Sequence, residues 1–303
     1  MDFETETATS RTLDCLSCSS QVVHGHVGNS AIQFPLQLNG WNVDTINTTQ
    51  FSNHPGYGRF KGQKTSASEV EAIFLGLMNI GCHYDTLLLG YVADAGTLRT
   101  IGNLFAEYST NHGARFVLDP VLGDNGKLYV SEDLIPVYKE IIRSGKVDMV
   151  TPNQFELELL LGSKINSLKE LRNAMFQFQE EFRVKNVVVT SVSFPTGPNH
   201  DDSNIYLAGL CEDQWFYEKV PEIDAIFSGS GDLFLSLLNH LYYHFPLQEA
   251  LIKTASSVSK VLQLSYEMEL DNPCKIFKLD KLYVPHLRMV EARDILVLSV
   301  PNK

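Results

Sequence analysis

The amino-acid sequence predicts an α/β fold with three layers: a mostly parallel central sheet flanked by helices, with antiparallel edge strands. Strand-like and helix-like segments alternate over roughly 190 residues, which favours βαβ units. The segments 85–90 and 115–118 are short and largely apolar, as buried parallel strands are. Two strands at 205–210 and 214–220 flank the turn Cys211-Glu212-Asp213, which indicates an antiparallel hairpin.

The other elements are expected from apolar spacing and from signals at their ends. Ser66 or Ser68 is a suitable N-cap for a helix at 67–79, whereas Pro35 is unusual inside a helix at 31–38. Gly40 and Trp41 form a turn before a strand at 43–49. The remaining strands are expected at 12–19, 147–150, 186–189 and around 296–298, and the remaining helices at 98–108, 134–142, 168–182 and 247–268, with one opened by 151–156 and one after 231.

The chain is expected to form one domain. Its 303 residues contain no evident linker, repeat or low-complexity segment. Residues 1–10 are acidic and rich in Thr, and we expect them to form a disordered extension. Residues 11–303 would then make up a single α/β domain.

Composition excludes several classes of partner. The formal net charge of −12 disfavours nucleic acids and anionic membranes, although local N–H groups or a metal can still bind a nucleotide. The sequence shows no secretory signal and no apolar run long enough to span a membrane. We therefore expect a cytoplasmic protein, with the nucleus also compatible. Its five scattered cysteines are expected to be free thiols, and Cys15-x-x-Cys18 lacks the second pair that a zinc site needs.

The stretch Gly229-Ser230-Gly231-Asp232 precedes an apolar run that predicts a buried helix. Free backbone N–H groups and the helix dipole make such a turn an anion site. A carboxylate would repel a merely bound phosphate, but it suits a base that takes a proton from an attacking hydroxyl while the N–H groups stabilise a transferring phosphoryl group. By itself the stretch is equally compatible with a Gly-rich turn whose Asp lies in the first turn of a helix.

Polar residues also follow the predicted strands, where open α/β sheets bind their ligands. Each of them alone could be a cap or turn residue, but their shared position favours a site. Carboxylate oxygens suit a Mg²⁺ ion that bridges phosphates, so the set points to phosphoryl transfer. The chain has no P-loop motif and no G-x-G-x-x-G after the first strand. The residues concerned are Gly90, Tyr91, Asp119, Asp124, Thr151, Asn153, Glu156, Thr190 and Ser191; His24 and His26 are expected to be loop residues rather than metal ligands.

Together these motifs resemble the pyridoxal kinases of the ribokinase-like superfamily, from about Leu16 to the end of the chain. The Gly-Ser-Gly-Asp element marks the superfamily, whereas three longer motifs mark the pyridoxal kinase branch. These are Asp-Pro-Val-Leu-Gly-Asp at 119–124, Thr-Pro-Asn-x-x-Glu at 151–156 and Phe-Ser-Asn-His at 51–54. Shorter matches lie at 27–29, 34–37, 56–57, 61–63, 90–91, 190–191, 224–225 and 287–290.

The resemblance implies transfer of the ATP γ-phosphoryl group to the 5′-hydroxymethyl group of pyridoxal, pyridoxine or pyridoxamine, in vitamin B6 salvage by a homodimer. Asp232 would be the base, and the backbone of Gly229, Ser230 and Gly231 would form the anion hole. Ser20, Val27, His54, Tyr91 and Phe227 would surround the vitamer beside Asp232, with Tyr129 on a flap above it. Asp124 and Glu156 would lie at Mg²⁺ or another divalent ion, Asp119 and Thr151 near the phosphates or a monovalent K⁺ or Na⁺ ion, and Asn153, Glu156, Thr190, Ser191, Ile223, Asp224, Ala225 and Ser230 along the nucleotide.

Some residues depart from the family pattern. Pro55 stands where many relatives have Thr, Ser228 where Val is frequent, and His24-Gly25-His26 where Arg-Gly-Tyr is more usual. The flap over 125–127 is short. These departures bear on substrate preference and turnover rather than on the reaction class. Two alternatives therefore stay open: a hydroxymethylpyrimidine kinase of the same superfamily, and a catalytically weak B6-binding or regulatory protein.

Overall fold

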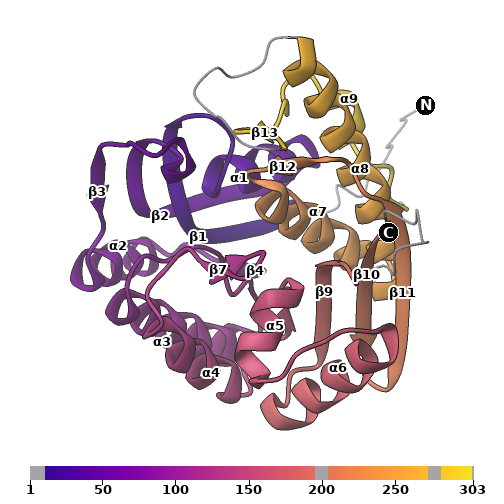
Figure 1. Cartoon of the computed structure of the whole chain (residues 1–303). Helices are drawn as coiled ribbons and strands as arrows, with labels where there is room; N and C mark the ends of the chain where they lie inside the picture. Colours follow the sequence, from indigo (N-terminus) through magenta and orange to yellow (C-terminus); the bar gives the residue numbers. More distant parts are fainter. Residues whose placement is uncertain (1–10, 195–203, 272–280, 302–303) are drawn as a thin grey trace, which may run out of the picture.

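The structure, a computed structural model, describes residues 11–194, 204–271 and 281–301, and within them a nine-stranded sheet forms the centre of the fold (Figure 1). The strand order is β11-β10-β9-β8-β5-β4-β1-β2-β3. The six middle strands from β9 to β2 pair in parallel, and β3, β10 and β11 add antiparallel edges. The bounds are β1 Asp14–His24, β2 Asn42–Asn53, β3 Gly62–Lys64, β4 Thr86–Leu89, β5 Arg115–Leu118, β8 Met149–Val150, β9 Asn186–Val192, β10 Asn204–Cys211 and β11 Gln214–Pro221. The predicted fold class is confirmed.

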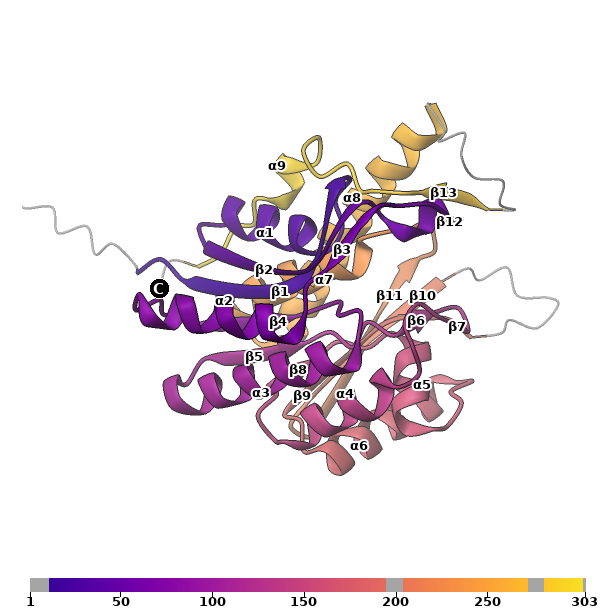
Figure 2. The same cartoon turned by 90° about the vertical axis from the view of Figure 1, so that its left-hand side faces the viewer.

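Helices cover both faces of this sheet, as Figure 2 shows. One layer holds α1 Asn29–Leu38, α7 Ser230–His244, α8 Leu247–Asp271 and the short α9 Arg293–Leu296. The other holds α2 Ala67–Asn79, α3 Ala95–His112, α4 Leu134–Arg143, α5 Gln154–Leu161 and α6 Leu168–Phe182. The expected extension at 1–10 and the fifth cysteine, Cys274, lie outside the described residues.

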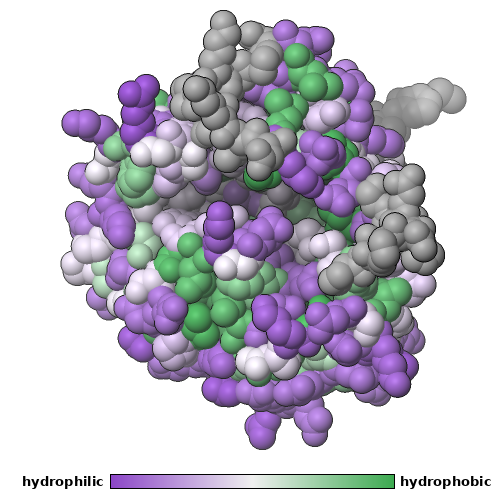
Figure 3. Space-filling view, in the orientation of Figure 1, coloured by the Kyte–Doolittle hydropathy of each residue, from purple (hydrophilic) through white to green (hydrophobic). Residues whose placement is uncertain are grey.

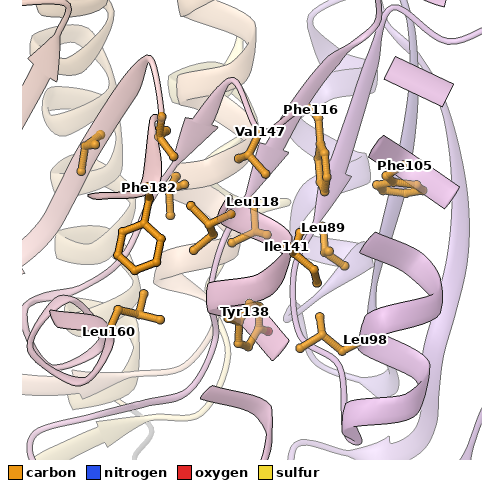
Figure 4. Close-up of a cluster of buried hydrophobic side chains, with 14 of the residues drawn as sticks. Leu89, Leu98, Phe105, Phe116, Leu118, Tyr138, Ile141, Val147, Leu160 and Phe182 are labelled. Carbon is orange, nitrogen blue, oxygen red and sulfur yellow. The ribbon is translucent and has the colours of Figure 1, made fainter. Parts of the chain in front are cut away.

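Two apolar cores lie on opposite faces of the sheet because side chains alternate along each strand. In β4, Leu87 and Leu89 belong to the core beneath α2–α6, whereas Leu88 belongs to the core beneath α1, α7 and α8. Figure 4 shows part of the first core, where the Phe105 and Phe116 rings meet edge to face with centroids 5.5 Å apart. Burial on both faces explains why these short strands are apolar throughout.

Local signals set several helix bounds. Ser66, not Ser68, caps α2, in a reciprocal pair of bonds with Glu69. Residues 168–182 form α6 as predicted, with Ser167 as its cap. The helix α1 keeps Pro35 inside it, where Pro35 packs in the buried face with Ile32 and Leu36. Burial of that face against α7 compensates for the loss of one helix hydrogen bond, because proline has no N–H to donate.

Two predicted strands are longer in the structure, and one predicted strand is absent from the described residues. The first two strands continue well past 19 and 49, to His24 and Asn53, because their polar residues pair through the backbone. The expected strand around 296–298 is wrong: Leu296 ends α9. There, the Asn39 side chain donates to Leu296 O and accepts from Leu298 N, both at 2.8 Å. These side-chain bonds occupy the backbone groups that a strand would have used.

Several small elements lie beyond the carboxyl ends of the parallel strands and outside the nine-stranded sheet (Figure 2). They are the hairpin of β6 Gly123–Asp124 with β7 Lys127–Leu128, the parallel pair of β12 Ala225–Phe227 with β13 Leu282–Val284, and the 3₁₀ turn Pro55–Tyr57. The four described cysteines are free thiols, and burial raises the pKa of Cys15 and Cys18 well above the usual range. No helix in the ranges that the structure covers is long and apolar enough to cross a membrane.

Candidate active site

The predicted anion site forms at the start of α7. Gly229 caps the helix in the left-handed region, with φ of 88°, and the first intrahelical bond joins Leu233 N to Gly229 O at 3.0 Å. The N–H groups of Ser230, Gly231 and Asp232 precede that bond and have no partner within the helix. A Cβ at Gly229 would lie 2.4 Å from His26 O, so glycine lets this turn approach the 24–28 loop.

Asp232 is held by that same loop. Its Oδ2 accepts a hydrogen bond of 2.8 Å from the backbone N–H of Gly28. Gly28 has φ of 57°, and a Cβ there would lie 2.1 Å from Ser20 O and 2.4 Å from Ser20 Oγ. The loop therefore packs tightly: Gly28 lies against Ser20, and Val27 lies against the Gly229 cap of α7. The role of Ser20 and Val27 in a vitamer pocket stays a prediction.

A second carboxylate faces Asp232. Asp119 follows β5 and is almost fully buried, and a Cβ on Gly231 would lie 3.8 Å from Asp119 Oδ2. Burial and the charge of Asp232 raise the pKa of Asp119 to about 8, although the Thr151 hydroxyl opposes the rise. Burial also raises the pKa of Asp232 to about 6, against the effect of the Gly28 N–H. Two acids and Thr151 thus meet where β5, β8 and α7 converge.

Glu156 holds the neighbouring loop in place. Its Oε1 accepts from the backbone N–H groups of Leu122 and Gly123 at 2.9 and 3.3 Å, and its Oε2 accepts from Asn153 N at 2.8 Å. Asn153 in turn caps α5 and donates from Nδ2 to Gly123 O at 2.7 Å. Both oxygens of Glu156 are therefore engaged by backbone donors. Burial and the charge of Asp119 raise its pKa despite those bonds.

The acids fit a hard cation held partly by a substrate. Within residues 11–194, 204–271 and 281–301, no group of three or more His, Cys, Asp or Glu could hold a metal unaided. Mg²⁺ commonly takes one or two carboxylates and completes its shell with water and phosphate. The oxygens of Asp124 accept from Asn125 N and Nδ2 at 2.8 and 3.0 Å, and burial raises the pKa of Asp124. A cation beside Asp119 and Asp124 would relieve this unfavourable burial of charge.

The predicted nucleotide residues fall into two groups. Thr190 pairs with Asn153 in a parallel bridge, so it lies beside the Glu156 cluster. Ser191, with φ of 46°, lies next to it in β9, which continues further than expected. The segment Ile223, Asp224, Ala225 lies at the start of β12, and Asp224 makes an ion pair of 3.0 Å with Lys281 rather than with the site.

The other predicted vitamer residues lie in four further segments. His54 follows β2 and caps the 3₁₀ turn Pro55–Tyr57, and Phe227 ends β12. Tyr91 is fixed through its backbone by Ser19 Oγ at 3.1 Å and Thr48 Oγ1 at 2.7 Å. Tyr129 is 61% exposed, and partial burial with the charges of Asp124 and Glu156 raises its pKa to about 12. The face seen in Figure 3 is hollowed near its centre. An open pocket of about 310 Å³ next to His54 is lined by His24, Ser52, Asn53, Tyr57 and Arg59.

Sequence reasoning missed two groups. The amide of Gly28 positions Asp232, yet a backbone donor leaves no mark in the sequence beyond the glycine itself. Tyr283 lies 3.3 Å from His54 Nδ1 and 2.6 Å from Ser228 Oγ, although it belongs to no recognised motif. The only sequence feature that could have drawn attention to Tyr283 is its aromatic ring within the short apolar segment 282–284.

Comparisons with known proteins identify the family of this chain. A family model described as phosphomethylpyrimidine kinase matches residues 64–271. The putative pyridoxal kinase BUD17 of Saccharomyces cerevisiae is 36% identical over 294 residues, which cover 93% of this chain and 92% of that protein. Human pyridoxal kinase is 38% identical over 264 residues, with coverage of 82% and 84%.

Solved structures give the same result. The structure of Leishmania donovani pyridoxal kinase in complex with ADP and pyridoxine superimposes with a TM-score of 0.82, at 28% identity, over 93% of this chain and 95% of that one. The likeness therefore includes sequence, fold and nearly the whole length of the relatives. This chain is a kinase that belongs to the pyridoxal kinase family of the ribokinase-like superfamily.

Proposed function

We propose that this protein transfers the γ-phosphoryl group of ATP to the 5′-hydroxymethyl group of pyridoxal, pyridoxine or pyridoxamine. The observation that carries the proposal is the position of Asp232 at the N-terminus of α7, next to Asp119 and held by the Gly28 N–H. A carboxylate beside free backbone N–H groups is suited to deprotonate a hydroxyl and to stabilise the phosphoryl group that it attacks. The relatives named above are kinases of pyridoxal.

Asp232 is the proposed base. As the 5′-oxygen forms its bond to the γ-phosphorus, the hydroxyl proton passes to the Asp232 carboxylate and the bond between the γ-phosphorus and the bridging oxygen breaks, which releases ADP. The backbone of Gly229, Ser230 and Gly231 faces the transferring group, and the unpaired N–H groups of the first turn stabilise its charge. Asp232 stays oriented throughout because Gly28 N holds Oδ2.

Asp119, Asp124 and Thr151 are the proposed residues around cations at the phosphates. When bound, Mg²⁺ or another divalent ion supplies charge neutralisation for the phosphate oxygens. Asp124 is the proposed direct ligand. Glu156 is proposed to act at this ion through water, because both of its oxygens already accept backbone N–H groups. Asp119 and Thr151 are also proposed to lie near a monovalent K⁺ or Na⁺ ion.

The nucleotide and the vitamer are proposed to bind on either side of this centre. Asn153, Thr190, Ser191 and Ser230 would border the ATP phosphates and sugar, with Ile223, Asp224 and Ala225 further out. Ser20, Val27, His54, Tyr91 and Phe227 would enclose the pyridine ring, and Tyr129 would close over it. The contacts of Val27 and Gly28 with the start of α7, and the packing of Ser20 against Gly28, support the vitamer side most directly.

The first test replaces the base. We expect Asp232→Ala to lower kcat for pyridoxal by roughly 10²–10⁴, the usual effect of losing a positioned base. The melting temperature should change little, because the side chain accepts one hydrogen bond from the residues that the structure describes. An Asp232→Ala protein that phosphorylated pyridoxal at the wild-type rate would show that Asp232 is not the base.

A substrate panel separates this proposal from its alternatives. Pyridoxal, pyridoxine, pyridoxamine and hydroxymethylpyrimidine would each be offered with Mg-ATP, and kcat/KM compared. The description of the matched family model makes the pyrimidine a necessary comparison. A higher kcat/KM for the pyrimidine would identify the sister activity. Tight vitamer binding without ADP formation would instead identify a B6-binding or regulatory protein.

Two further proposals concern the assembly and the location of the protein. We propose a homodimer, which light scattering on the purified protein would detect as twice the 34.0 kDa chain mass. We also propose a cytoplasmic location, with the nucleus included, which a fluorescent fusion would test.

A further inference from the structure

A chain of hydrogen bonds joins distant segments and ends on the ring of His54. The Ser228 and Tyr283 hydroxyls lie 2.6 Å apart, and the Tyr283 hydroxyl lies 3.3 Å from Nδ1 of His54. Nδ1 also accepts from the backbone N–H of Gly56 at 3.1 Å. Two donor groups thus meet at Nδ1 of His54, the Gly56 amide directly beside it and the Tyr283 hydroxyl from a distant strand, and Ser228 reaches the ring through Tyr283.

The backbone N–H of Gly56 fixes the direction of each of these hydrogen bonds. Because Nδ1 accepts from Gly56 N–H, this nitrogen carries no proton, so Tyr283 must donate to it. The Tyr283 hydroxyl has a single hydrogen, so it must accept from Ser228. The neutral ring of His54 therefore carries its proton on Nε2. Burial lowers the pKa of His54, which favours the neutral ring.

The backbone is shaped for this arrangement. A Cβ on Gly56 would lie 2.4 Å from the Tyr283 hydroxyl and 2.7 Å from His54 Nδ1, so only glycine admits both. The pairing of β12 with β13 places Ile226 opposite Tyr283, and Ser228 N donates to Val284 O at 3.1 Å. Ser228 is buried, so its hydroxyl meets the Tyr283 hydroxyl away from bulk water.

We propose that Tyr283 and Ser228 are positioning residues that hold His54 with Nε2–H as a fixed donor toward the ring hydroxyl oxygen shared by the three vitamers. The inference rests on the proposed function, in which His54 lines the vitamer pocket. In the described part of the chain, the side-chain hydrogen bonds of His54 all go to Nδ1, so Nε2–H remains available to a ligand. A fixed donor selects rings that present an acceptor at that point and disfavours rings that lack one.

Kinetics with two substrates test this role. Tyr283→Phe removes the hydroxyl and keeps the ring, and Tyr217→Phe on the exposed part of β11 is the matched control. We expect Tyr283→Phe to raise KM for pyridoxine about three- to tenfold, the effect of losing one hydrogen bond. The KM for ATP and the value of kcat should stay within about twofold. Discrimination against 3-deoxypyridoxine, which lacks the ring hydroxyl, should become weaker in Tyr283→Phe but not in Tyr217→Phe.

An unchanged ratio of kcat/KM between pyridoxine and its deoxy analogue in Tyr283→Phe would overturn the inference. If Tyr283→Phe does not fold, Ser228→Ala should shift the same ratio in the same direction by a smaller amount, and an unchanged ratio in that variant would also overturn the inference.

A measurement without turnover separates this inference from the proposed function. Two-bond ¹H–¹⁵N NMR spectra of the ligand-free protein, assigned with His54→Gln, should show the Nε2–H tautomer. An Nδ1–H tautomer would refute the bond directions, whereas a wild type inactive on every vitamer would refute only the proposed function.

Discussion

The backbone N–H of Gly28 donates a hydrogen bond of 2.8 Å to Oδ2 of Asp232, across 204 positions of sequence. The bond joins the loop after β1 to the first turn of α7. Oδ1 of Asp232 is the oxygen that we propose to accept the proton of the substrate hydroxyl. It also opposes the rise in the pKa of Asp232 that burial causes.

This bond predicts a large effect of Gly28→Ala. The new Cβ would lie 2.1 Å from Ser20 O, in a residue with φ of 57°, so the loop must move and its N–H leaves Asp232. We expect kcat to fall at least tenfold, as is usual when a catalytic group is misplaced by about 1 Å. Gly40→Ala is the control, since Gly40 has φ of 80° but no atom within 4 Å of its added Cβ. Equal losses of kcat in the two variants would mean that backbone strain, not the bond to Asp232, is responsible.

The raised pKa of Asp232 predicts an acid limb in the rate profile. A base must be unprotonated, so kcat/KM for the vitamer should rise with pH and level off above an apparent pKa of about 6. Steady-state rates between pH 5 and 8 would measure this limb, with a coupling assay checked for its own pH dependence. A limb centred near pH 4 would indicate that Asp232 is fully solvated in the active enzyme.

The raised pKa of Asp119 predicts a stability that falls with pH. The unfolded carboxyl loses its proton near pH 4 and the folded one near pH 8, so the folded state binds more protons between these values. From pH 7 to 8 the free energy of unfolding should fall by roughly 1 kcal/mol from this group. Asp119→Asn should show a shallower slope and a higher melting temperature at pH 8, measured by circular dichroism without divalent ions. A slope identical to that of the wild type would contradict the assignment to Asp119.

The three backbone donors around Glu156 predict a structural cost for its removal. Glu156→Ala leaves the N–H groups of Leu122, Gly123 and Asn153 without this acceptor, in a buried setting. We expect a loss of about 2–4 kcal/mol in unfolding free energy, measured by urea denaturation. Turnover should fall as well, because Asp124 follows the segment that Glu156 anchors. Glu69→Ala provides the comparison, since Glu69 forms the same kind of capping box on the exposed α2, and it should destabilise far less. Similar losses in both variants would argue against the anchoring role.

The sequence by itself determined the architecture of the fold and the types of residue that lie at the ends of its strands. Alternating strand-like and helix-like segments predict the parallel sheet, and residues 168–182 form α6 as predicted. The acidic residues that follow the strands are also evident from the sequence. These features depend on side chains within a few positions of one another, through periodicity and capping. The assignment of roles to those acids stays a prediction.

Only the tertiary structure decided how the groups meet. The bonds from Gly28 to Asp232 and from Tyr283 to His54 join residues more than 200 positions apart, and one of the donors is a backbone amide. The tail at Leu296 became part of a helix because the Asn39 side chain took its backbone groups. Such contacts depend on where the whole fold brings distant segments together, and no local pattern of residue types records that.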